Sequence, residues 1–356
     1  MASTVDKAPI SEFSLAEARR IVGDLFRPDP RIYWIDWGLT IATGHTLFLL
    51  VAFLPALLSE PAWLVWSLRV VGLLAASLLY YRSAMFIHEL VHLRGDEFRS
   101  FRFLWNWLSG CTFLMPTFVY YTHLDHHRRK LFGTPKDGEY IPLACRPRYH
   151  ILVYLALPFA VPVAAVFRFL VLTPLAWLSP TIRSLVHERA SSMVMEPNYL
   201  RPLPTKNMMR IIIVQEVVCF IWLLVASTLM LTVLREWAWT LLLEAYLAGV
   251  VILMQNSIRT LGAHRYYNSG NEMTFVEQML DSVNYPGGGI LPEVWAPVGT
   301  RYHALHHLFP SMPYHRMAEA HRRLVRDLPE DSAYRLTNEA SLYSALRTLW
   351  RRAGKA

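Results

Sequence analysis

The sequence has few cysteines and few charged residues. Cys111, Cys145 and Cys219 are the three cysteines and show no CxxC spacing, so neither a disulfide scaffold nor a sulfur-ligated metal site is expected. Charged residues make up 17% of the chain. No basic stripe alternates with aromatic residues, which argues against a nucleic-acid partner. Residues 1–31 mix charges of both signs and do not resemble a signal peptide.

Apolar residues are abundant, at 54% of the chain with a mean hydropathy of +0.26, which is high for a soluble protein. A helix needs about 20 mostly apolar residues to span a membrane. Short connections, "SEPA" and "REW", join the qualifying stretches in pairs, so the sequence predicts an all-α integral membrane fold with two transmembrane hairpins. The four predicted spans are residues 38–58, 64–87, 211–234 and 237–258. Tryptophans that would form an aromatic belt flank them: Trp34, Trp37, Trp63, Trp66, Trp237 and Trp239.

The charge distribution predicts the orientation of these hairpins. The first hairpin tip, near Glu60, has no Lys or Arg, whereas the segment between the hairpins and the C-terminal segment are basic. By the positive-inside rule, both basic segments lie in the cytoplasm and form a helical cap. The net charge of +8 favours anionic partners such as membrane phosphates or acidic redox proteins. The basic residues between the hairpins are Arg94, Arg99, Arg102, Arg128, Arg129, Lys130 and Lys136.

Further apolar segments do not read as simple spans. Residues 150–178 contain three prolines and Arg168, so we expect this segment, like 103–121, to be interfacial or re-entrant. The C-terminal "SLYSALRTLWRR" predicts an amphipathic helix, either on the membrane surface or packed on the protein. "SLAE", from Ser14, predicts a capping box on a short surface helix. The chain therefore divides into an N-terminal cytoplasmic segment (1–31), a main domain (32–325) and an amphipathic tail (326–356).

Eight of the fourteen histidines fall in three boxes, "HELVH", "HLDHH" and "HALHH". Spacings of three and four residues converge on one helix face, and imidazole suits iron, zinc or copper. Eight ligands exceed the four of one zinc site, so two metals sharing eight or nine imidazoles fit the count. The boxed histidines are His88, His92, His123, His126, His127, His303, His306 and His307. His264, directly after the fourth predicted span, is a candidate ninth ligand.

Other readings of the boxes remain open at this point. "HELVH" also fits the HExxH signature of zinc proteases, with Glu89 as general base. That reading needs a further ligand, for which the later spans offer Glu244 but no aspartate motif, and it leaves six boxed histidines unused. A non-enzymatic membrane scaffold would hold no metal at all.

The three boxes, interleaved with two hairpins, resemble the membrane fatty acid desaturase superfamily, which includes acyl hydroxylases, alkane hydroxylases and carotenoid ketolases. "HHLFP" at 306–310, followed by "PYH", is especially similar to the acyl-lipid desaturase branch. The resemblance covers roughly residues 35–325. It implies two non-haem iron ions held by the eight boxed histidines and His264.

The resemblance also directs attention to residues around the ligands. Some members have an asparagine four residues before the histidine that matches His264, where this chain has Thr260, so a water-mediated contact there is in question. Carboxylates near the boxes are candidates to orient the ligand rings. They are Glu89, Asp125, Asp137, Glu139 and Asp281.

The implied chemistry is oxidation of an unactivated C–H bond with O2 as co-substrate. We expect a desaturase that introduces a C=C bond into a lipid or an acyl thioester. The alternative is an acyl or alkane hydroxylase, or a carotenoid ketolase or hydroxylase, of the same superfamily. The chain has no flavin, haem or iron–sulfur module, so an external donor of the ferredoxin or cytochrome b5 type is implied. The expected location is a bacterial inner membrane, rather than the endoplasmic reticulum, with the active site cytoplasmic.

Overall fold

The computed structural model describes residues 13–58, 61–93 and 98–355, and this part of the chain is helical, with isolated β-bridges in place of strands. The predicted hairpin tip near Glu60 and the predicted basic residue Arg94 lie outside the described residues. Five helices are long and apolar enough to cross a membrane, so the chain is a multi-pass membrane protein. They are α2 (Pro30–Leu57), α3 (Ala62–His92), the helical run Tyr149–Leu178, α9 (Lys206–Leu231) and the run Arg235–Ala263, which contains η6 (Arg235–Trp237) and α10 (Ala238–Ala263).

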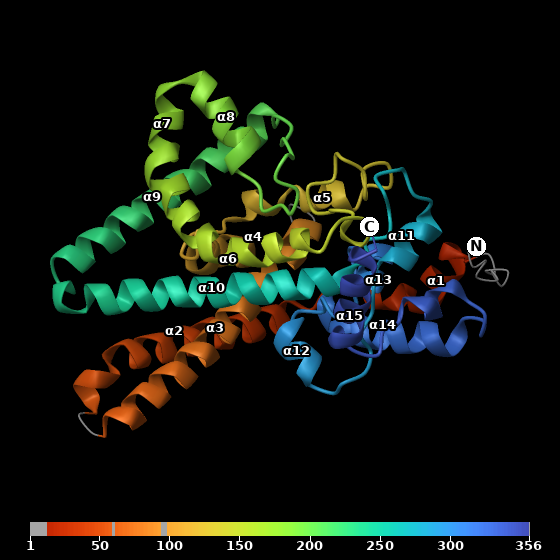
Figure 1. The fold of residues 1–356 in the computed structure, drawn as a ribbon, viewed down its shortest axis with the longest axis horizontal. Helices are drawn as coiled ribbons and strands as arrows, with labels where there is room; N and C mark the ends of the chain where they lie inside the picture. Colours follow the sequence, from red (N-terminus) through yellow and green to blue (C-terminus); the bar gives the residue numbers. More distant parts are fainter. Residues whose placement is uncertain (1–12, 59–60, 94–97, 356) are drawn as a thin grey trace.

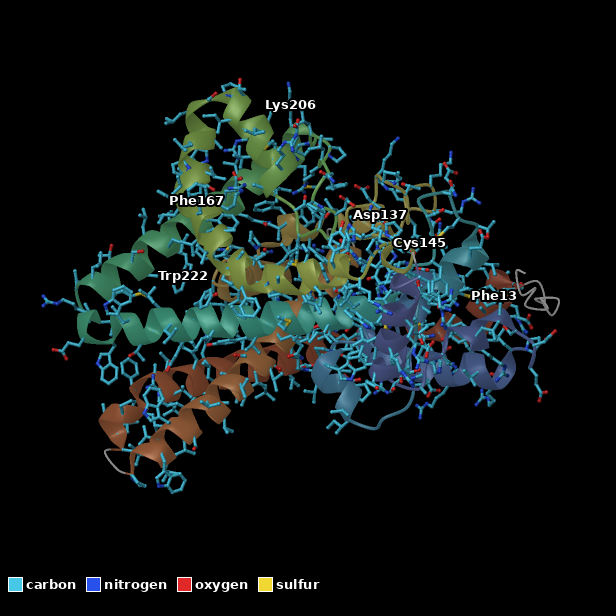
Figure 2. All side chains as sticks on the ribbon, in the orientation of Figure 1. Phe13, Asp137, Cys145, Phe167, Lys206 and Trp222 are labelled. Atoms are coloured by element: carbon cyan, nitrogen blue, oxygen red, sulfur yellow. The ribbon has the colours of Figure 1, made fainter. Side chains whose placement is uncertain are left out.

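Two helical hairpins correspond to the predicted pairs of spans. In Figure 1, α2 and α3 form one arm, while α9 and α10 meet at the end of a second arm. Both arms point to the same side of the molecule. Figure 2 places Trp222 along the α9 arm and Asp137 and Cys145 at the opposite end. We call the segments gathered at that opposite end, residues 13–26, 117–148 and 264–355, the cap.

The run Tyr149–Leu178 is bent. It consists of α6 (Tyr149–Phe167), the π-turn η5 (Arg168–Leu172) and α7 (Thr173–Leu178), followed by α8 (Pro180–Ala190). α6 lies against α10, and α7 turns away from it after η5 (Figure 1). Buried Arg168 pairs with Glu216 of α9 and donates to the carbonyl of Ala190 (2.7 Å). That this run is re-entrant or interfacial stays a prediction, which the bend supports.

Short helices build the rest of the chain. Residues 103–121 are divided among α4 (Arg99–Trp105), the π-turn η2 (Asn106–Gly110) and η3 (Thr117–Tyr120), each too short to span a membrane. The cap consists of α1 (Leu15–Val22), η1 (Gly23–Phe26), α5 (His123–His126), η4 (Leu143–Cys145), α11 (Phe275–Asp281), α12 (Leu291–Trp295), α13 (His303–Leu308), α14 (Tyr314–Asp327), η7 (Ala333–Thr337) and α15 (Leu342–Ala353).

Both terminal helices pack into the cap. Ser14 caps α1 by accepting a hydrogen bond from the backbone N–H of Glu17 (3.2 Å), and α1 packs on α14. α15 buries Leu349 and Ala353, while Trp350 remains 39% exposed. A Cβ at Gly262 would lie 2.4 Å from Leu342, so glycine there permits the close approach of α10 and α15. Of the two predicted positions of the C-terminal helix, the structure therefore shows its apolar face packed on the protein.

Candidate metal centre

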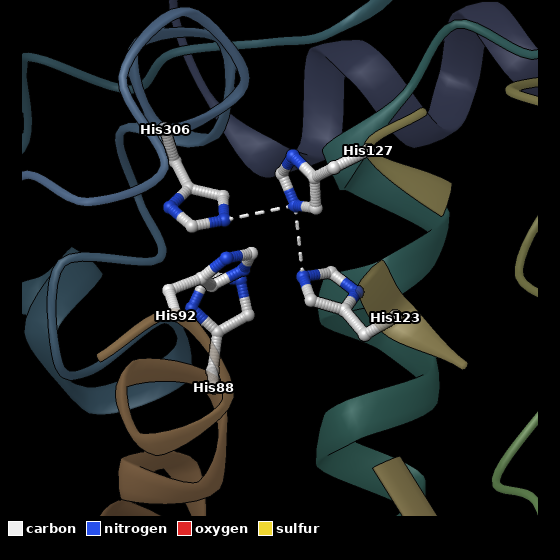
Figure 3. A group of neighbouring side chains, drawn as sticks. All are labelled: His88, His92, His123, His127 and His306. Atoms are coloured by element: carbon white, nitrogen blue, oxygen red, sulfur yellow. Dashed lines mark hydrogen bonds between the residues drawn. The ribbon is translucent and has the colours of Figure 1, made fainter. Parts of the chain in front are cut away.

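Nine histidines converge in the interior, and they are the nine predicted from the sequence. Within each of two groups, one ring nitrogen per residue lies within 4.8 Å of the others. Figure 3 shows the first group, with His88 and His92 entering from α3 and His306 facing His127. The five-histidine group is His88, His92, His123, His127 and His306. The four-histidine group is His126, His264, His303 and His307.

The HxxHH boxes divide their histidines between the two groups. In α5 and the residue after it, His123 and His127 enter the five-histidine group, whereas His126 enters the other. In α13, His303 and His307 enter the four-histidine group, whereas His306 crosses to the first. In each box the first and last histidines are four residues apart and lie one above the other on the helix, whereas the middle histidine is rotated away from them. Each box therefore links the two groups, rather than presenting one face to one metal.

The spacing of the ring nitrogens fits metal ligation. Nε2 of His127 lies 3.0 Å from Nε2 of both His123 and His306 (Figure 3). Nε2 of His303 lies 2.9 Å from that of His264 and 3.1 Å from that of His307. Nitrogens 2.0–2.1 Å from one ion and at right angles to each other are about 3 Å apart. The residues present therefore fit two metal ions.

Burial favours the neutral form, which ligation requires, in several of these rings. Desolvation, followed by the charges of neighbouring histidines, holds the pKa values of His127, His306 and His307 well below the ordinary value of 6.5. Both ring nitrogens of His88 are buried without a hydrogen-bond partner among the described residues. Buried nitrogens without partners are costly unless something occupies their lone pairs.

Three of the predicted carboxylates contact ligand rings. His126 Nδ1 donates to Asp137 Oδ2 (2.8 Å), and His123 Nδ1 donates to Glu139 Oε2 (2.8 Å). His264 Nδ1 lies 3.4 Å from Asp281 Oδ2. Such partners fix the ring orientation and leave Nε2 to face the metal. These contacts are those expected of residues that orient ligand rings.

Charge and burial compete at these carboxylates. Burial raises the pKa of Glu139 to about 8. Burial also opposes ionisation of Asp137, but His126 and the backbone donors of Gly133 and Glu139 outweigh it and hold the pKa of Asp137 below its usual value. For His126, burial is likewise outweighed by Asp137, so its pKa is raised. The contact between Asp137 and His126 therefore favours the charged form of both groups.

Among the described residues, the hydrogen bonds and ion pairs of Glu89 and Asp125 go to groups other than ligand rings, so their ring-orienting role stays a prediction that these contacts do not support. Glu89 Oε2 accepts hydrogen bonds from Tyr33 Oη (2.5 Å) and from the backbone of Tyr314 (3.2 Å). Asp125 pairs with Arg128 at 2.7 Å. Each carboxylate is next to a ligand histidine in sequence, and adjacent helix residues point in different directions.

A small cavity of about 60 Å³ adjoins both groups. Thr260 lines it, and its Oγ1 lies 3.1 Å from Nη2 of Arg259. Arg259 was not predicted as a site residue, because an arginine near the end of a span is normally an anchor at the membrane surface. Its position within the last turns of an apolar helix is the signal that could have identified it. The cavity is lined by His123, His126, His264, His303, Glu139 and Arg259, among others.

Fold and site together define a class: a multi-pass helical membrane protein whose paired histidine clusters can hold metal ions. The family model for fatty acid desaturases matches residues 63–338, and the chain belongs to this family. It is 36% identical over 349 residues to the ceramide hydroxylase of Caulobacter vibrioides (strain NA1000 / CB15N), an alignment that covers 96% of this chain and 95% of the relative. No solved structure matches the chain significantly.

Proposed function

We propose that the protein is an O2-dependent lipid hydroxylase with two non-haem iron ions, acting on ceramide or a closely related amide-linked lipid. The observation that carries this proposal is the 36% identity, along nearly the whole chain, to a ceramide hydroxylase. Hydroxylation was the alternative to the desaturation expected from the sequence, and this relative favours it.

The nine histidines would hold the two ions, five around one and four around the other. When bound, the iron ions supply the two-electron activation of O2 that oxidation of an unactivated C–H bond requires. The chain contributes the surroundings. Asp137 and Glu139 hold the rings of His126 and His123 through Nδ1. Burial of the two histidine groups limits the access of water.

The overall reaction balances as R–H + O2 + 2e⁻ + 2H⁺ → R–OH + H2O. One oxygen atom enters the lipid, the other leaves as water, and the two electrons come from a separate protein. We propose a donor of the ferredoxin or cytochrome b5 type, because the net charge of +8 suits an acidic partner.

Desaturation is the second candidate, supported by the family match. It consumes the same O2 and electrons but removes two neighbouring hydrogens: R–CH2–CH2–R′ + O2 + 2e⁻ + 2H⁺ → R–CH=CH–R′ + 2H2O. A zinc protease is disfavoured, because nine histidines share the site and Glu89 is hydrogen-bonded to Tyr33 and Tyr314 rather than free beside the rings.

We further propose four spans in a bacterial inner membrane, with the cap and its metal centre in the cytoplasm. The catalytic domain would occupy residues 32–325. The packing of α1 and α15 into the cap supports treating residues 13–31 and 326–355 as parts of one folded unit with it.

A lipid comparison tests the proposed function. Cells that supply ceramide express the wild-type chain, His306→Ala or His150→Ala, and lipid extracts are analysed by mass spectrometry. His150 lies outside both groups and contacts the carbonyl of Pro147, so this variant is the matched control. The proposal predicts hydroxylated ceramide with the wild type and His150→Ala, and none with His306→Ala. A new double bond without a hydroxyl group would instead establish the second candidate.

A further inference from the structure

Arg259 is a buried cation with unused hydrogen-bond donors. It lies on α10, five residues before His264, and the residue is only 6% exposed. Nη2 donates to Asn256 Oδ1 (3.3 Å) and Thr260 Oγ1 (3.1 Å). Nε and Nη1 have no partner among the described residues.

A buried guanidinium whose Nε and Nη1 have no hydrogen-bond partner among the described residues requires a further acceptor. A buried charge without a partner is strongly unfavourable, and proteins normally satisfy such donors with an oxygen. The surroundings that act on Arg259 electrostatically are chiefly the rings of Tyr81, Tyr120 and Tyr154. The hydroxyl of Tyr81 is within hydrogen-bonding reach of the guanidinium, but a neutral phenol oxygen does not offset the positive charge of a buried cation.

Arg259 lines a cavity together with metal-site histidines. Arg259, His123 of the five-histidine group and His303 of the four-histidine group line the same space of about 60 Å³. An oxygen bound to Arg259 and a C–H bond facing the histidines would therefore be separated by few covalent bonds.

Glu139 places a hydrogen-bond acceptor on another wall of the cavity. Its Oε2 accepts from His123, whereas its Oε1 is buried without a partner, and the residue lines the cavity. A secondary amide presents one carbonyl acceptor and one N–H donor. Arg259 and Glu139 together complement these two groups.

The depth of Arg259 also suits the polar region of a lipid. It lies in the last turns of the apolar run Arg235–Ala263, at the end that meets the cap. Residues at such helix ends lie near the membrane–water interface, where the amide of a ceramide also lies. The acyl and sphingoid chains would extend into the membrane from there.

We propose that Arg259 anchors the amide carbonyl of the lipid substrate and thereby directs hydroxylation to a carbon within a few bonds of that amide. This inference rests on the proposed function and adds the site of oxidation and the group that is recognised. Mid-chain oxidation does not fit an anchor in the same small cavity as the histidines.

The test uses the iron-loaded enzyme in lipid nanodiscs, as wild type, Arg259→Gln, Arg259→Lys and Arg322→Gln. Arg322 is exposed on α14 and pairs with Glu319, so it is the matched control. Three quantities are measured: iron content, ceramide affinity without O2, and hydroxyl position by tandem mass spectrometry. A second arm offers the wild type ceramide, N-methyl ceramide and a free fatty acid.

The expected wild-type product carries its hydroxyl group within a few carbons of the amide. Arg259→Gln keeps its iron, binds ceramide at least tenfold more weakly and spreads the hydroxyl over several positions. Arg259→Lys lies between, and Arg322→Gln matches the wild type. N-methyl ceramide and the free acid bind more weakly than ceramide.

Two results would overturn the anchor. One is a hydroxyl group in mid-chain in the product of the wild-type enzyme, a result that does not depend on whether any variant folds. The other is an Arg259→Gln enzyme with unchanged affinity and position. A double bond beside the amide, without hydroxyl, would refute the proposed hydroxylase while supporting the anchor, so the two claims fail separately.

Discussion

At the scale of single residues, the ligand histidines use their two ring nitrogens differently. Nε2 atoms face one another within each group, at 3.0 Å between His127 and His306. Nδ1 of His123 and His126 instead faces a carboxylate. A carboxylate that accepts from Nδ1 fixes the ring and makes Nε2 a better ligand. We therefore expect the neighbouring acids to affect metal binding through the rings that they hold.

Asp137→Asn tests this role against a matched neighbour. The amide cannot carry the negative charge that stabilises the Nδ1–H of His126, so we expect iron affinity to fall about 10- to 100-fold. Asp125→Asn, whose side chain pairs with Arg128 instead of a ligand ring, should leave affinity unchanged. Iron competition with a chelator measures both variants, and equal losses in the two would contradict the assignment.

His321 gives a prediction on pH that is independent of the metal. It is buried, contacts Tyr334 Oη (2.8 Å), and burial followed by the charge of Arg301 lowers its pKa to about 4. Between pH 6.5 and 4 the unfolded chain binds this proton and the folded chain does not. Folding stability should therefore fall as the pH drops through this window, by up to about 1.4 kcal/mol per pH unit.

Thermal unfolding of the metal-free protein in detergent at pH 7 and pH 5 measures this effect. The His321→Gln variant, which cannot be protonated, should lose less stability between these pH values than the wild type. Parallel losses in the two proteins would show that His321 does not titrate as described.

At the scale of elements, the bend between α6 and α7 is held by buried charge. Glu216 of α9 pairs with Arg168 of η5 and Arg183 of α8. Removing one partner of a buried ion pair leaves an uncompensated charge. The positions of η5 and α8 beside the second arm therefore depend on one carboxylate.

Glu216→Gln should destabilise the protein by about 3–5 kcal/mol. Glu236→Gln, at an exposed residue of η6, is the control and should have little effect. Midpoints of unfolding in detergent compare the two, and a Glu216→Gln protein as stable as the control would show that the ion cluster does not hold the bend.

The elements also show which features the sequence could predict. Spacing identified the eight boxed histidines, because each box lies within one or two helix turns, and the family resemblance added His264. Hydropathy identified α2, α3, α9 and α10. Asp137 and Asp281 reach the rings only through the folding of loops, which spacing does not encode. Glu139 contacts the ring of His123, whereas Glu89 contacts Tyr33 instead of a ligand ring. Glu89 follows His88 directly on α3, and adjacent residues on a helix face different directions. The apolar surroundings of Arg259 in the sequence distinguish it weakly from a membrane-surface anchor, whereas its partnerless nitrogens and its place in the cavity wall depend on the fold.

At the scale of the whole molecule, two spans end at the level of the metal centre. α3 ends at His92, and α10 ends one residue before His264. The cap supplies the remaining ligands from α5, the residue after it, and α13. A substrate C–H bond held near the membrane–water interface would therefore lie close to histidines from both arms and from the cap.

The native cysteines offer a test of orientation. Cys145 is exposed in the cap, whereas Cys111 and Cys219 are buried. With the cap in the cytoplasm, a membrane-impermeant maleimide should label Cys145 only after the inner membrane is opened. A Glu236→Cys variant, at the opposite end of the molecule, should be labelled in spheroplasts that are still sealed. Labelling of Cys145 in sealed spheroplasts would place the cap outside.

The central claim is that the two histidine groups hold iron that transfers one atom of O2 to an amide-linked lipid. The most direct measurement supplies ¹⁸O2 to purified enzyme containing two irons per chain, with ceramide and a reduced ferredoxin, and follows the label by mass spectrometry. The account predicts one ¹⁸O atom in each hydroxylated ceramide and none with His306→Ala. Label found in water alone, with an unsaturated or unchanged lipid, would contradict it.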